Sequence, residues 1–497
     1  MTNEEPLVLA AEVQKHANRE DCWIVVEGKV WDLTDFAPEH PGGLESITEH
    51  AGHDATEVYN AFHAPSLLPT TLGPSKLIGK LDPSTPLPTY QKPPPTSTPQ
   101  LGTQPVEKPP LDTILSTHDF EDVASRTLTP KTWAFYSSAA TDCHTRSLNN
   151  SLFHRLLFRP RLLRNVQRVS THTTILGHHV SLPFFVSPAA MARMAHPEGE
   201  KALARGCASR GVMQCVSTNA SFPIGEIVGA VAEEGEGEGR RPPLFFQLYV
   251  NRERAKSEAL LREVEALGVK AVVLTVDAPV AGKREADERV KAEGGLRAPM
   301  SGGEAGNDKK GGGMGRIMGS FVDPTVRWED IEWIRRCMKL PLVLKGIQCA
   351  ADAKMAMEMG VDGIMLSNHG GRSLDTSPPA ILVLLELHKC CPEIFDKMEI
   401  YVDGGIRRGT DILKAICLGA TAVGLGRPFL YSLAYGQEGV EHLIEILKDE
   451  VKTSMRMIGL TTLDQAHPGY VNTLDVDYLV PGTETHPYAR RRPKARL

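Results

Sequence analysis

The segment LSNHGGRSLD (residues 366–375) places a base and a cation three residues apart, directly after an apolar run. The run 363–366 has the composition of a buried strand, and the pair Gly370-Gly371 separates His369 from Arg372. A histidine can accept a proton near neutral pH, and an arginine can hold a carboxylate through two parallel hydrogen bonds. The segment therefore predicts a site that binds an acid and accepts a proton.

Three residues elsewhere in the chain extend this chemistry. Asp277, in LTVDAP, could orient an imidazole and stabilise its charged form. Lys345, in LKGI, provides a fixed positive charge, which suits a flavin ring that becomes anionic on reduction. Tyr249 can form a hydrogen bond with a substrate hydroxyl. Together these residues indicate a carboxylate substrate with an α-hydroxyl, oxidised by a flavin.

Two glycine-rich segments near the end of the chain each contain arginine. VDGGIRRG (402–409) includes Arg407, and GLGRPF (424–429) includes Arg427. Glycines allow a phosphate to approach backbone N–H groups, and arginine adds bidentate hydrogen bonds. The two segments are interpreted as a phosphate site, with two tight turns carrying surface arginines as the alternative.

Short apolar runs that alternate with helix-patterned segments must position these residues. Eight buried strands alternating with helices predict a (β/α)8 barrel, whose chemistry lies at the C-terminal ends of its strands. A doubly wound open sheet is the structural alternative. The count of eight, and the polar residue that closes each run, favour the barrel. The runs span 183–190, 213–218, 243–250, 271–279, 341–347, 363–371, 399–406 and 422–429.

The 497 residues suggest several domains, and a proline-rich segment divides them. Ten prolines between residues 83 and 110, among Ser, Thr and Gln, are typical of an extended linker. The net charge of -6 and the absence of a basic stripe argue against nucleic acid as a partner. No apolar run approaches the roughly 18 residues that cross a bilayer. We expect units at 5–82, 112–480 and 481–497, with 83–111 as the linker.

The small N-terminal unit contains two histidines beside aromatic and apolar residues: His40, in DFAPEHPGG, and His63, in FHAPS. With CWIVVEGKVWDLT, these motifs resemble the cytochrome b5 family over about residues 7–82. The resemblance implies a small α+β domain in which both histidines ligate the iron of haem b. A haem with no open axial position carries electrons and does not activate oxygen.

The large unit is similar to the FMN-dependent (S)-2-hydroxy-acid dehydrogenase/oxidase family over about residues 112–480. The matching motifs are FFQLYV, LTVDAP, LKGI, LSNHGGR, VDGGIRRG and GLGRPFLY. A cytochrome b5-like unit joined to this barrel resembles flavocytochrome-type L-lactate dehydrogenases. The resemblance implies that His369 is the base and Asp277 its partner, that Arg372 and Arg284 act on the substrate, and that Tyr249 binds its hydroxyl.

The same resemblance implies the FMN contacts. These are Ala190, Ser217, Gln247, Thr275, Lys345, Ser367, Asp403, Gly404, Gly405, Arg407, Gly426 and Arg427. The residues are compatible with transfer of a hydride and with a carbanion route. The resemblance also implies a homo-oligomer, with a tetramer as the family's common form.

Two positions depart from the family pattern and affect the choice of substrate. The first of two consecutive tyrosines is replaced by Phe135 in WAFYSSAA, where Ala139 also replaces a glycine. Losing a hydroxyl that bonds a charged group costs ~1.5–3 kcal/mol of binding if nothing replaces it. Asn219 stands where the flavocytochrome type has an aliphatic residue. These changes point to a substrate other than lactate.

Three functions compete. The first is an L-2-hydroxy-acid dehydrogenase in which FMN takes two electrons and haem passes them on singly, with cytochrome c as an acceptor. The second is an oxidase that forms hydrogen peroxide. The third, a haem or flavin sensor, predicts loss of the base or of the carboxylate anchor, yet His369 and Arg372 are both present.

The termini bear on location. The N-terminus lacks the features of a presequence, and the C-terminal Ala495-Arg496-Leu497 fits a peroxisomal address. We therefore expect the cytosol or the peroxisome, with the mitochondrial intermembrane space as the alternative that the family resemblance implies. Scattered cysteines indicate a reducing compartment.

One segment interrupts the barrel pattern. Residues 292–320 are rich in glycine and lack a periodic apolar pattern, so they predict a mobile or disordered flap.

Overall fold

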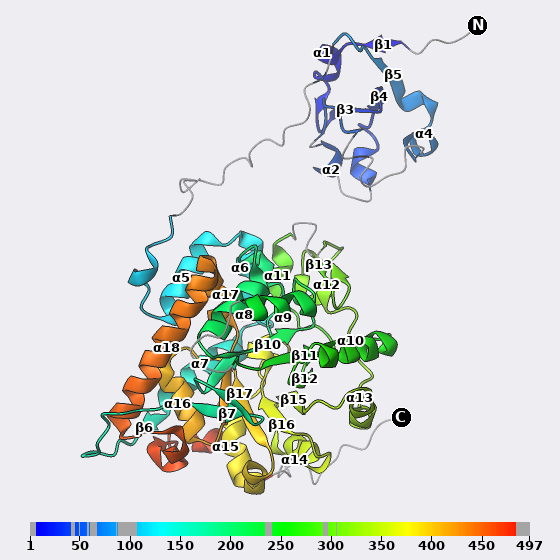
Figure 1. The fold of residues 1–497 in the computed structure, drawn as a ribbon. Helices are drawn as coiled ribbons and strands as arrows, with labels where there is room; N and C mark the ends of the chain where they lie inside the picture. Colours follow the sequence, from blue (N-terminus) through cyan, green and yellow to red (C-terminus); the bar gives the residue numbers. More distant parts are fainter. Residues whose placement is uncertain are drawn as a thin grey trace. The chain divides into compact units, whose positions relative to one another are not determined.

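The computed structural model describes residues 6–40, 45–48, 50–56, 59, 67–85, 87, 107–233, 241–291, 297–304 and 306–483. The chain divides into two units, Met1–Thr103 and Gln104–Leu497, each described here by itself (Figure 1). His63, most of the expected linker and Ala495–Leu497 lie outside the described residues. The haem-ligand role of His63 and the peroxisomal address therefore stay predictions.

The N-terminal unit is built on a five-stranded sheet in the order β1-β5-β4-β3-β2. Apolar residues of β3 and β4 pack with Ala51, Ala55 and Leu68 into one core, and Cys22 and Trp31 are buried within it. The result is the small α+β domain that the sequence predicts. Its elements are β1 Leu7–Val8, α1 Ala10–Val13, β2 Ala17–Asn18, β3 Asp21–Val26, β4 Lys29–Asp32, α2 Glu45–Thr48, α4 Leu67–Leu72 and β5 Leu77–Leu81.

The C-terminal unit contains a closed barrel of eight parallel strands in the order β10-β11-β12-β15-β16-β17-β18-β9. Each strand falls within one of the eight predicted runs, so the barrel is confirmed and the open doubly wound sheet is wrong. The strands are β9 Phe184–Val186, β10 Met213–Ser217, β11 Leu244–Leu248, β12 Ala271–Thr275, β15 Leu342–Ile347, β16 Gly363–Leu366, β17 Glu399–Asp403 and β18 Ala422–Leu425.

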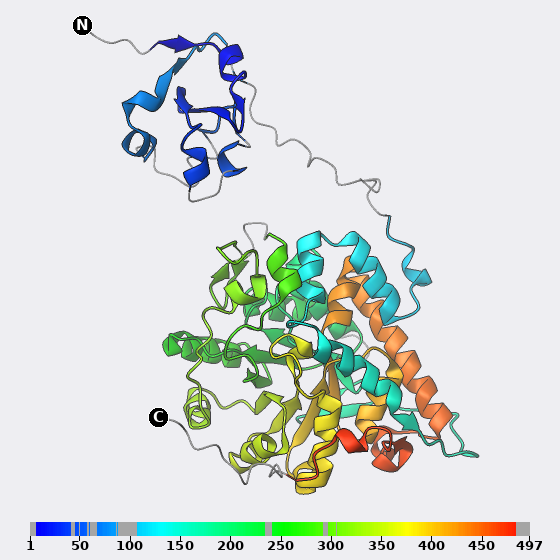
Figure 2. The same ribbon diagram turned by 180° about the vertical axis from the view of Figure 1, so that it is seen from behind.

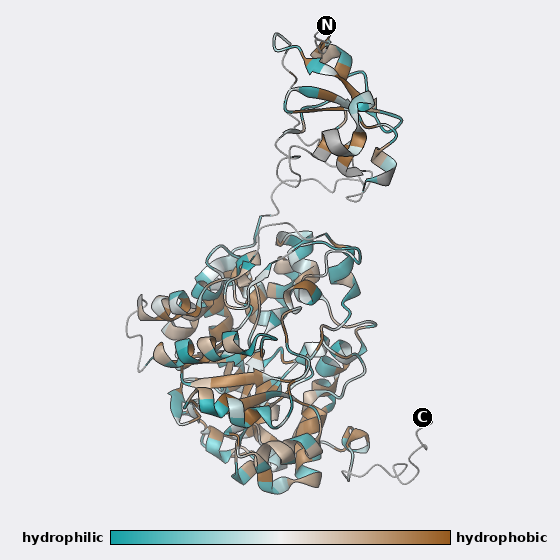
Figure 3. Cartoon of the chain, turned by 90° about the vertical axis from the view of Figure 1, so that its right-hand side faces the viewer, coloured by the Kyte–Doolittle hydropathy of each residue, from teal (hydrophilic) through white to brown (hydrophobic). Residues whose placement is uncertain are grey.

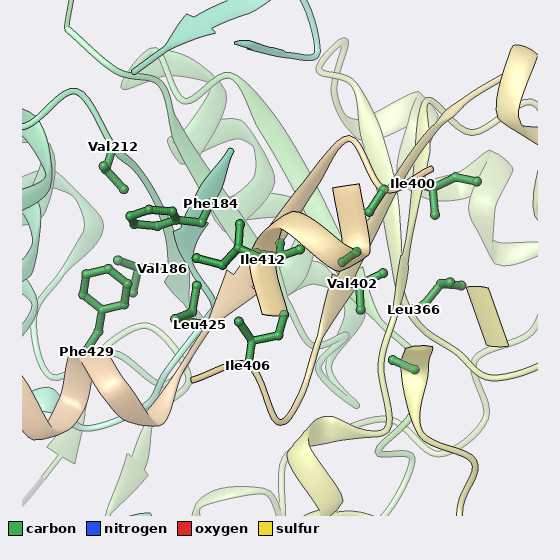
Figure 4. Packing of buried hydrophobic residues seen from close by; sticks show 14 of the residues in the cluster. Phe184, Val186, Val212, Leu366, Ile400, Val402, Ile406, Ile412, Leu425 and Phe429 are labelled. Atoms are coloured by element: carbon green, nitrogen blue, oxygen red, sulfur yellow. The ribbon is translucent and has the colours of Figure 1, made fainter. Parts of the chain in front are cut away.

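The barrel strands are apolar on both faces because each face packs against protein. Phe185 points into the barrel with Met213 and Tyr401, whereas Phe184 and Val186 belong to the core between strands and helices (Figure 4). The antiparallel hairpin of β7 Thr173–Ile175 and β8 His178–Val180 adds Ile175 and Val180 to the interior cluster. The barrel is thus filled by side chains, which leaves the strand ends for the site.

Helices surround the barrel, and brown, hydrophobic ribbon is concentrated in its strands (Figures 2 and 3). Among the described residues, no helix has both the length and the apolar character needed to cross a membrane. The helices are α5 Thr117–Thr127, α6 Pro130–Ser137, α7 His144–Arg155, α8 Gly199–Ser209, α9 Ile224–Glu233, α10 Arg254–Ala266, α13 Asp330–Cys337, α14 Ala350–Glu358, α15 Ala380–Cys390, α16 Gly409–Cys417, α17 Arg427–Ser432 and α18 Gly436–Ile458. Outside the barrel, β6 Leu157–Phe158 pairs with β19 Val471–Asn472.

The chain between β12 and β15 makes a long excursion over the mouth of the barrel. Its described part contains α11 Glu285–Arg289, a two-stranded ladder of β13 Arg297–Ala298 and β14 Gly303–Glu304, and α12 Met314–Met318. Of the two alternatives for 292–320, disorder is therefore wrong for residues 297–304 and 306–320, and the mobile flap stays a prediction. Residues 292–296 and 305 lie outside the described part.

A buried ion pair anchors this excursion to α6. Lys131 Nζ lies 2.5 Å from Asp287 Oδ1 and donates to the carbonyls of Gly312, at 2.6 Å, and Val290, at 3.0 Å. Both charged side chains are at most 3% exposed. Asp287 Oδ2 accepts a further hydrogen bond from the N–H of Gly315. One lysine thus connects three parts of the excursion to the barrel.

Replacing Lys131 with methionine should destabilise the C-terminal unit by about 3–5 kcal/mol, because Asp287 would keep a buried charge without a counter-ion. The measurement is urea unfolding followed by tryptophan fluorescence. The matched control is Lys256→Met, since Lys256 pairs with Glu253 on the surface and such pairs contribute only about 0–1 kcal/mol. Equal losses in the two variants would contradict the anchoring role.

Candidate active site

A cavity of about 630 Å³ lies at the C-terminal ends of the barrel strands. Its lining brings together residues that the sequence analysis singled out on separate strands: Ala190, Ser217, Tyr249, Arg284, Lys345, His369, Arg372, Asp403, Gly404, Gly405, Arg407, Gly426 and Arg427. Gln247, Thr275, Asp277 and Ser367 are not in the lining but are buried at the ends of the same strands. Phe135 and Asn219 also line the cavity.

The imidazole of His369 is held through both of its nitrogens. Nδ1 lies 2.7 Å from Asp277 Oδ1, and Nε2 lies 3.2 Å from the hydroxyl of Tyr249. The backbone of His369 has a φ of 59°, in the left-handed region, and its N–H donates to Ser367 Oγ at 3.0 Å. A non-glycine residue in this conformation is typical of functional sites, where the surroundings stabilise it. The ring is therefore fixed in position before a substrate arrives.

The protonation states follow from burial and from neighbouring charges. Burial lowers the pKa of His369 below its ordinary value, and the carboxylate of Asp277 opposes that shift only in part. The imidazole is therefore neutral near pH 7 and can accept a proton. Burial raises the pKa of Asp277, but His369 and Lys345 outweigh it and lower the pKa, which keeps the carboxylate charged. Burial and the charge of Asp277 raise the pKa of Tyr249 to about 12, so the phenol remains a donor.

Lys345 lies between two carboxylates at the centre of the mouth. Its Nζ is 3.8 Å from Asp277 Oδ2 and 3.5 Å from Asp403 Oδ2, and it donates to Ser367 Oγ at 2.8 Å. Burial disfavours the ammonium, but Asp403 and Asp277 outweigh burial and raise the pKa of Lys345. The side chain is 4% exposed, so it provides a permanent positive charge inside the barrel.

Three guanidinium groups, those of Arg284, Arg372 and Arg427, line the same cavity. Burial lowers the pKa of Arg372, and the charges of Arg284 and Arg427 lower it further. Burial also lowers the pKa of Arg284, and it lowers that of Arg427 to about 10. Because arginine stays protonated in proteins, these shifts indicate buried positive charge that an anion would neutralise.

Backbone carbonyls at the end of α6 hold two of these arginines. Arg372 Nη1 donates to the carbonyls of Phe135, Tyr136 and Ser138 at 2.8–3.0 Å, and Arg427 donates to those of Tyr136 and Ser138 at 2.9 Å. The guanidinium of Arg372 also lies over the ring of Phe135, 5.2 Å from its centroid. Both guanidiniums are therefore oriented by the fold, although these carbonyls carry no charge to balance them.

The remaining polar groups of the mouth fit a cofactor with a phosphate and a polar ring. Gln247 Nε2, Thr275 Oγ1 and Asp403 Oδ1 are buried and lack a hydrogen-bond partner among the described residues. A Cβ at Gly405 would lie 2.1 Å from Asn149 O, and φ is +80° there. Only glycine therefore allows the backbone to pass this close to α7 at the edge of the cavity. Asp403 lines the cavity, and Gln247 and Thr275 lie next to it at the ends of the same strands. Buried polar groups without partners at such a place are typical of a ligand site, and this amide, hydroxyl and carboxylate fit FMN.

Several residues that position the site could not be predicted from the sequence. Asn149 of α7 and Asn368 exchange two amide hydrogen bonds of 2.8 Å directly behind His369. Glu121 of α5 lies 2.6 Å from Arg407 Nη1, so the predicted phosphate ligand Arg407 already has a charged partner. These contacts join residues far apart in the chain and leave no local spacing pattern. Asn368 was detectable only as a neighbour of His369.

The N-terminal unit provides one described candidate for a haem ligand. His40 ends the 3₁₀ turn Ala37–Glu39 and is half-buried, and its ring centroid lies 5.9 Å from that of Phe36. An imidazole beside an apolar core fits the donor that haem iron takes.

The sequence of the large unit matches the family model described as FMN-dependent dehydrogenase over residues 124–473. The chain belongs to the FMN-dependent dehydrogenase family. Residues 10–82 match the cytochrome b5-like heme/steroid binding domain. Both resemblances inferred from the motifs are confirmed, and with them FMN and haem as the cofactors.

This FMN-dependent dehydrogenase is similar in sequence to curated relatives of two kinds, a cytochrome-dependent dehydrogenase and an oxidase. The L-lactate dehydrogenase (cytochrome) of Saccharomyces cerevisiae is 43% identical over 470 residues, which cover 92% of this chain and 78% of the relative. A peroxisomal (S)-2-hydroxyacid oxidase of Arabidopsis thaliana is 36% identical over 370 residues, covering 73% of this chain and 98% of the relative. The first alignment thus covers more of the chain than the second.

Solved structures give the same picture. A flavocytochrome b2 variant with pyruvate bound is 42% identical with a TM-score of 0.66, covering 76% of this chain and 91% of that one. Mandelate oxidase with (S)-4-hydroxymandelic acid is 34% identical, also with a TM-score of 0.66, covering 72% of this chain and 98% of that one. The barrel is therefore that of the family.

Proposed function

We propose that this FMN-dependent dehydrogenase oxidises a small L-2-hydroxy acid to the 2-oxo acid and passes the electrons through haem b to cytochrome c. The observation that carries the proposal is the fixed imidazole of His369. One of its nitrogens bonds Asp277, and the other lies beside Tyr249 at the cavity. The name of the yeast relative, L-lactate dehydrogenase (cytochrome), supports lactate as the type of substrate.

Arg372 and Arg284 are the proposed anchors of the substrate carboxylate. Both line the cavity, and Arg284 Nε donates to the backbone carbonyl of Arg372 at 3.1 Å, which holds the Arg284 side chain against that backbone. A Cβ at Gly315 would lie 2.3 Å from Arg284 Nη1, which shows how closely the excursion packs on this side chain. Phe135 contributes its ring where the family pattern has a tyrosine hydroxyl. The two arginines therefore carry carboxylate binding without that hydroxyl.

Proton transfer is assigned to His369. Oxidation of the acid removes two electrons and two protons, one proton from the hydroxyl and the other from the α-carbon. The neutral imidazole accepts one proton at Nε2, while Asp277 stabilises the imidazolium that forms. Tyr249 donates a hydrogen bond to the hydroxyl oxygen and thereby orients the substrate. Lys345 holds an ammonium between the carboxylates of Asp277 and Asp403, next to the base.

The cofactors supply the redox chemistry. FMN, when bound, would accept the two electrons together with the proton that His369 does not take, and haem b would carry the electrons away singly. The proposed haem ligands are His40 and His63. The residues proposed to hold FMN are Ala190, Ser217, Gln247, Thr275, Lys345, Ser367, Asp403, Gly404, Gly405, Arg407, Gly426 and Arg427.

A hydrogen-peroxide-forming oxidase is the second candidate, and the likeness to the peroxisomal oxidase of Arabidopsis favours it. That alignment covers 73% of the chain, whereas the alignment with the cytochrome-dependent relative covers 92%. Residues 10–82 also match the cytochrome b5-like domain. An oxidase that passes electrons from flavin directly to oxygen would leave this domain without a role. These observations support the dehydrogenase.

Anaerobic mixing of the holoenzyme with L-lactate should bleach the flavin and then reduce the haem, both visible in the absorbance spectrum. His369→Gln should slow bleaching by ~10²–10⁴-fold while FMN stays bound, because the base is lost and the cavity is kept. The matched control is His388→Gln, since His388 bonds the carbonyl of Leu418 and is absent from the cavity lining. Bleaching by His369→Gln at the wild-type rate would contradict the assignment.

Replacing His40 with alanine should remove haem and abolish cytochrome c reduction, while anaerobic bleaching of the flavin by L-lactate continues. The physical reason is that a bis-histidine haem loses one of its two axial bonds. His16→Ala is the matched control, because His16 lies in the same unit, where it stacks on Trp23 at 3.6 Å. Retention of haem at the wild-type content in His40→Ala would contradict the ligand assignment.

A further inference from the structure

The side-chain amide of Asn219 lines the cavity and has no hydrogen-bond partner among the described residues. Asn219 follows β10 by two residues, lines the cavity with Tyr249 and His369, and is 7% exposed. Its Oδ1 is enclosed and has no partner, and its side chain forms no hydrogen bond with the described part of the chain. A buried polar group without a partner costs free energy, so a native site that keeps one calls for an explanation.

The backbone that carries this amide is held on both sides. The N–H of Asn219 donates to Ser217 Oγ at 3.1 Å, and its carbonyl accepts from the N–H of Met191 at 3.1 Å. Just beyond, Glu200 Oε1 accepts from the N–H groups of Ala192 and Ser221, at 2.9 Å each. The backbone at Asn219 is therefore fixed in place, so the unpaired amide is not the product of a loose loop.

A short chain of contacts connects Asn219 to the reacting groups. The hydroxyl of the preceding residue, Thr218, accepts a hydrogen bond from the N–H of Tyr249 at 3.1 Å. The hydroxyl of Tyr249 lies in turn 3.2 Å from His369 Nε2. The amide therefore belongs to the part of the mouth where the base acts.

We propose that Asn219 binds a second hydroxyl, on the side chain of the substrate, so that the enzyme prefers a 2-hydroxy acid with a further hydroxyl over lactate. An amide offers an acceptor oxygen and an NH2 group with two N–H donors, and a hydroxyl can pair with either group. A neutral amide supplies no counter-charge for a second carboxylate or for an ammonium group. This inference rests on the proposed function and names the substrate class of the same site.

The test compares L-lactate with L-glycerate, which differ by one hydroxyl on the third carbon. With the full-length holoenzyme under anaerobic conditions, the rate of flavin bleaching at low substrate should favour L-glycerate by at least ~10-fold, because a site built for a hydroxyl discriminates against the analogue that lacks it. Asn219→Leu should reduce this ratio by at least ~10-fold. Dissociation constants of 3-hydroxypyruvate and pyruvate, measured on the oxidised enzyme from flavin absorbance, should shift in the same sense.

Gln214→Met is the matched control. Gln214 is 2% exposed on β10, its Oε1 also lacks a partner among the described residues, and it does not line the cavity. Its removal should leave the ratio unchanged. A ratio near one in the wild-type enzyme would overturn the inference, and so would a ratio in Asn219→Leu equal to that of the wild type. Loss of FMN from Asn219→Leu with an unchanged ratio would also overturn it, because the amide would then bind the cofactor and not the substrate. If no 2-hydroxy acid bleaches the flavin, the proposed function itself is wrong.

Discussion

The hydrogen bond between Asp277 and His369 is the interaction on which the rest of the site depends. Asp277 is fully buried, and a carboxylate there stays charged only because His369 and Lys345 lie on either side of it. The barrel provides this arrangement, since β15 pairs with β12 on one edge and with β16 on the other, and the register between β15 and β16 shifts between Lys345 and Ile347. Strand order thus places an anion, a cation and a base together although they lie far apart in the sequence.

The charged groups of the cavity differ in how they are balanced. Lys345 lies between the carboxylates of Asp277 and Asp403, so its ammonium needs no further anion. Arg284 and Arg372 are oriented by backbone carbonyls, which carry no charge to balance them. An acid entering the cavity is therefore attracted to the arginines and meets the neutral base beside them. The arrangement selects an anionic substrate before any contact with its side chain.

The fold was predictable because both faces of each barrel strand are buried, which leaves near-continuous apolar runs such as those of β12 and β16. The site followed from the barrel, since polar residues that close such runs must meet at one mouth. The pairing of Asn149 with Asn368, and the Lys131 anchor of the excursion, could not be predicted in this way. Both join residues more than 150 positions apart, and neither has a periodic signal. The short helices and strands of the glycine-rich excursion could not be predicted either. Contacts with Lys131 of α6 hold the excursion in place, and they leave no local pattern in the sequence.

The pH dependence of flavin bleaching in Asp277→Asn tests most directly whether this carboxylate controls the base. In the wild-type enzyme, bleaching at low substrate should rise with pH through the pKa of His369, which lies below its ordinary value, and then level off. Removing Asp277 removes the charge that raises this pKa, so the rise should move to lower pH, and the plateau should fall by ~10²-fold or more because the imidazolium loses its partner. A rise at the same or higher pH, with an unchanged plateau, would contradict the account.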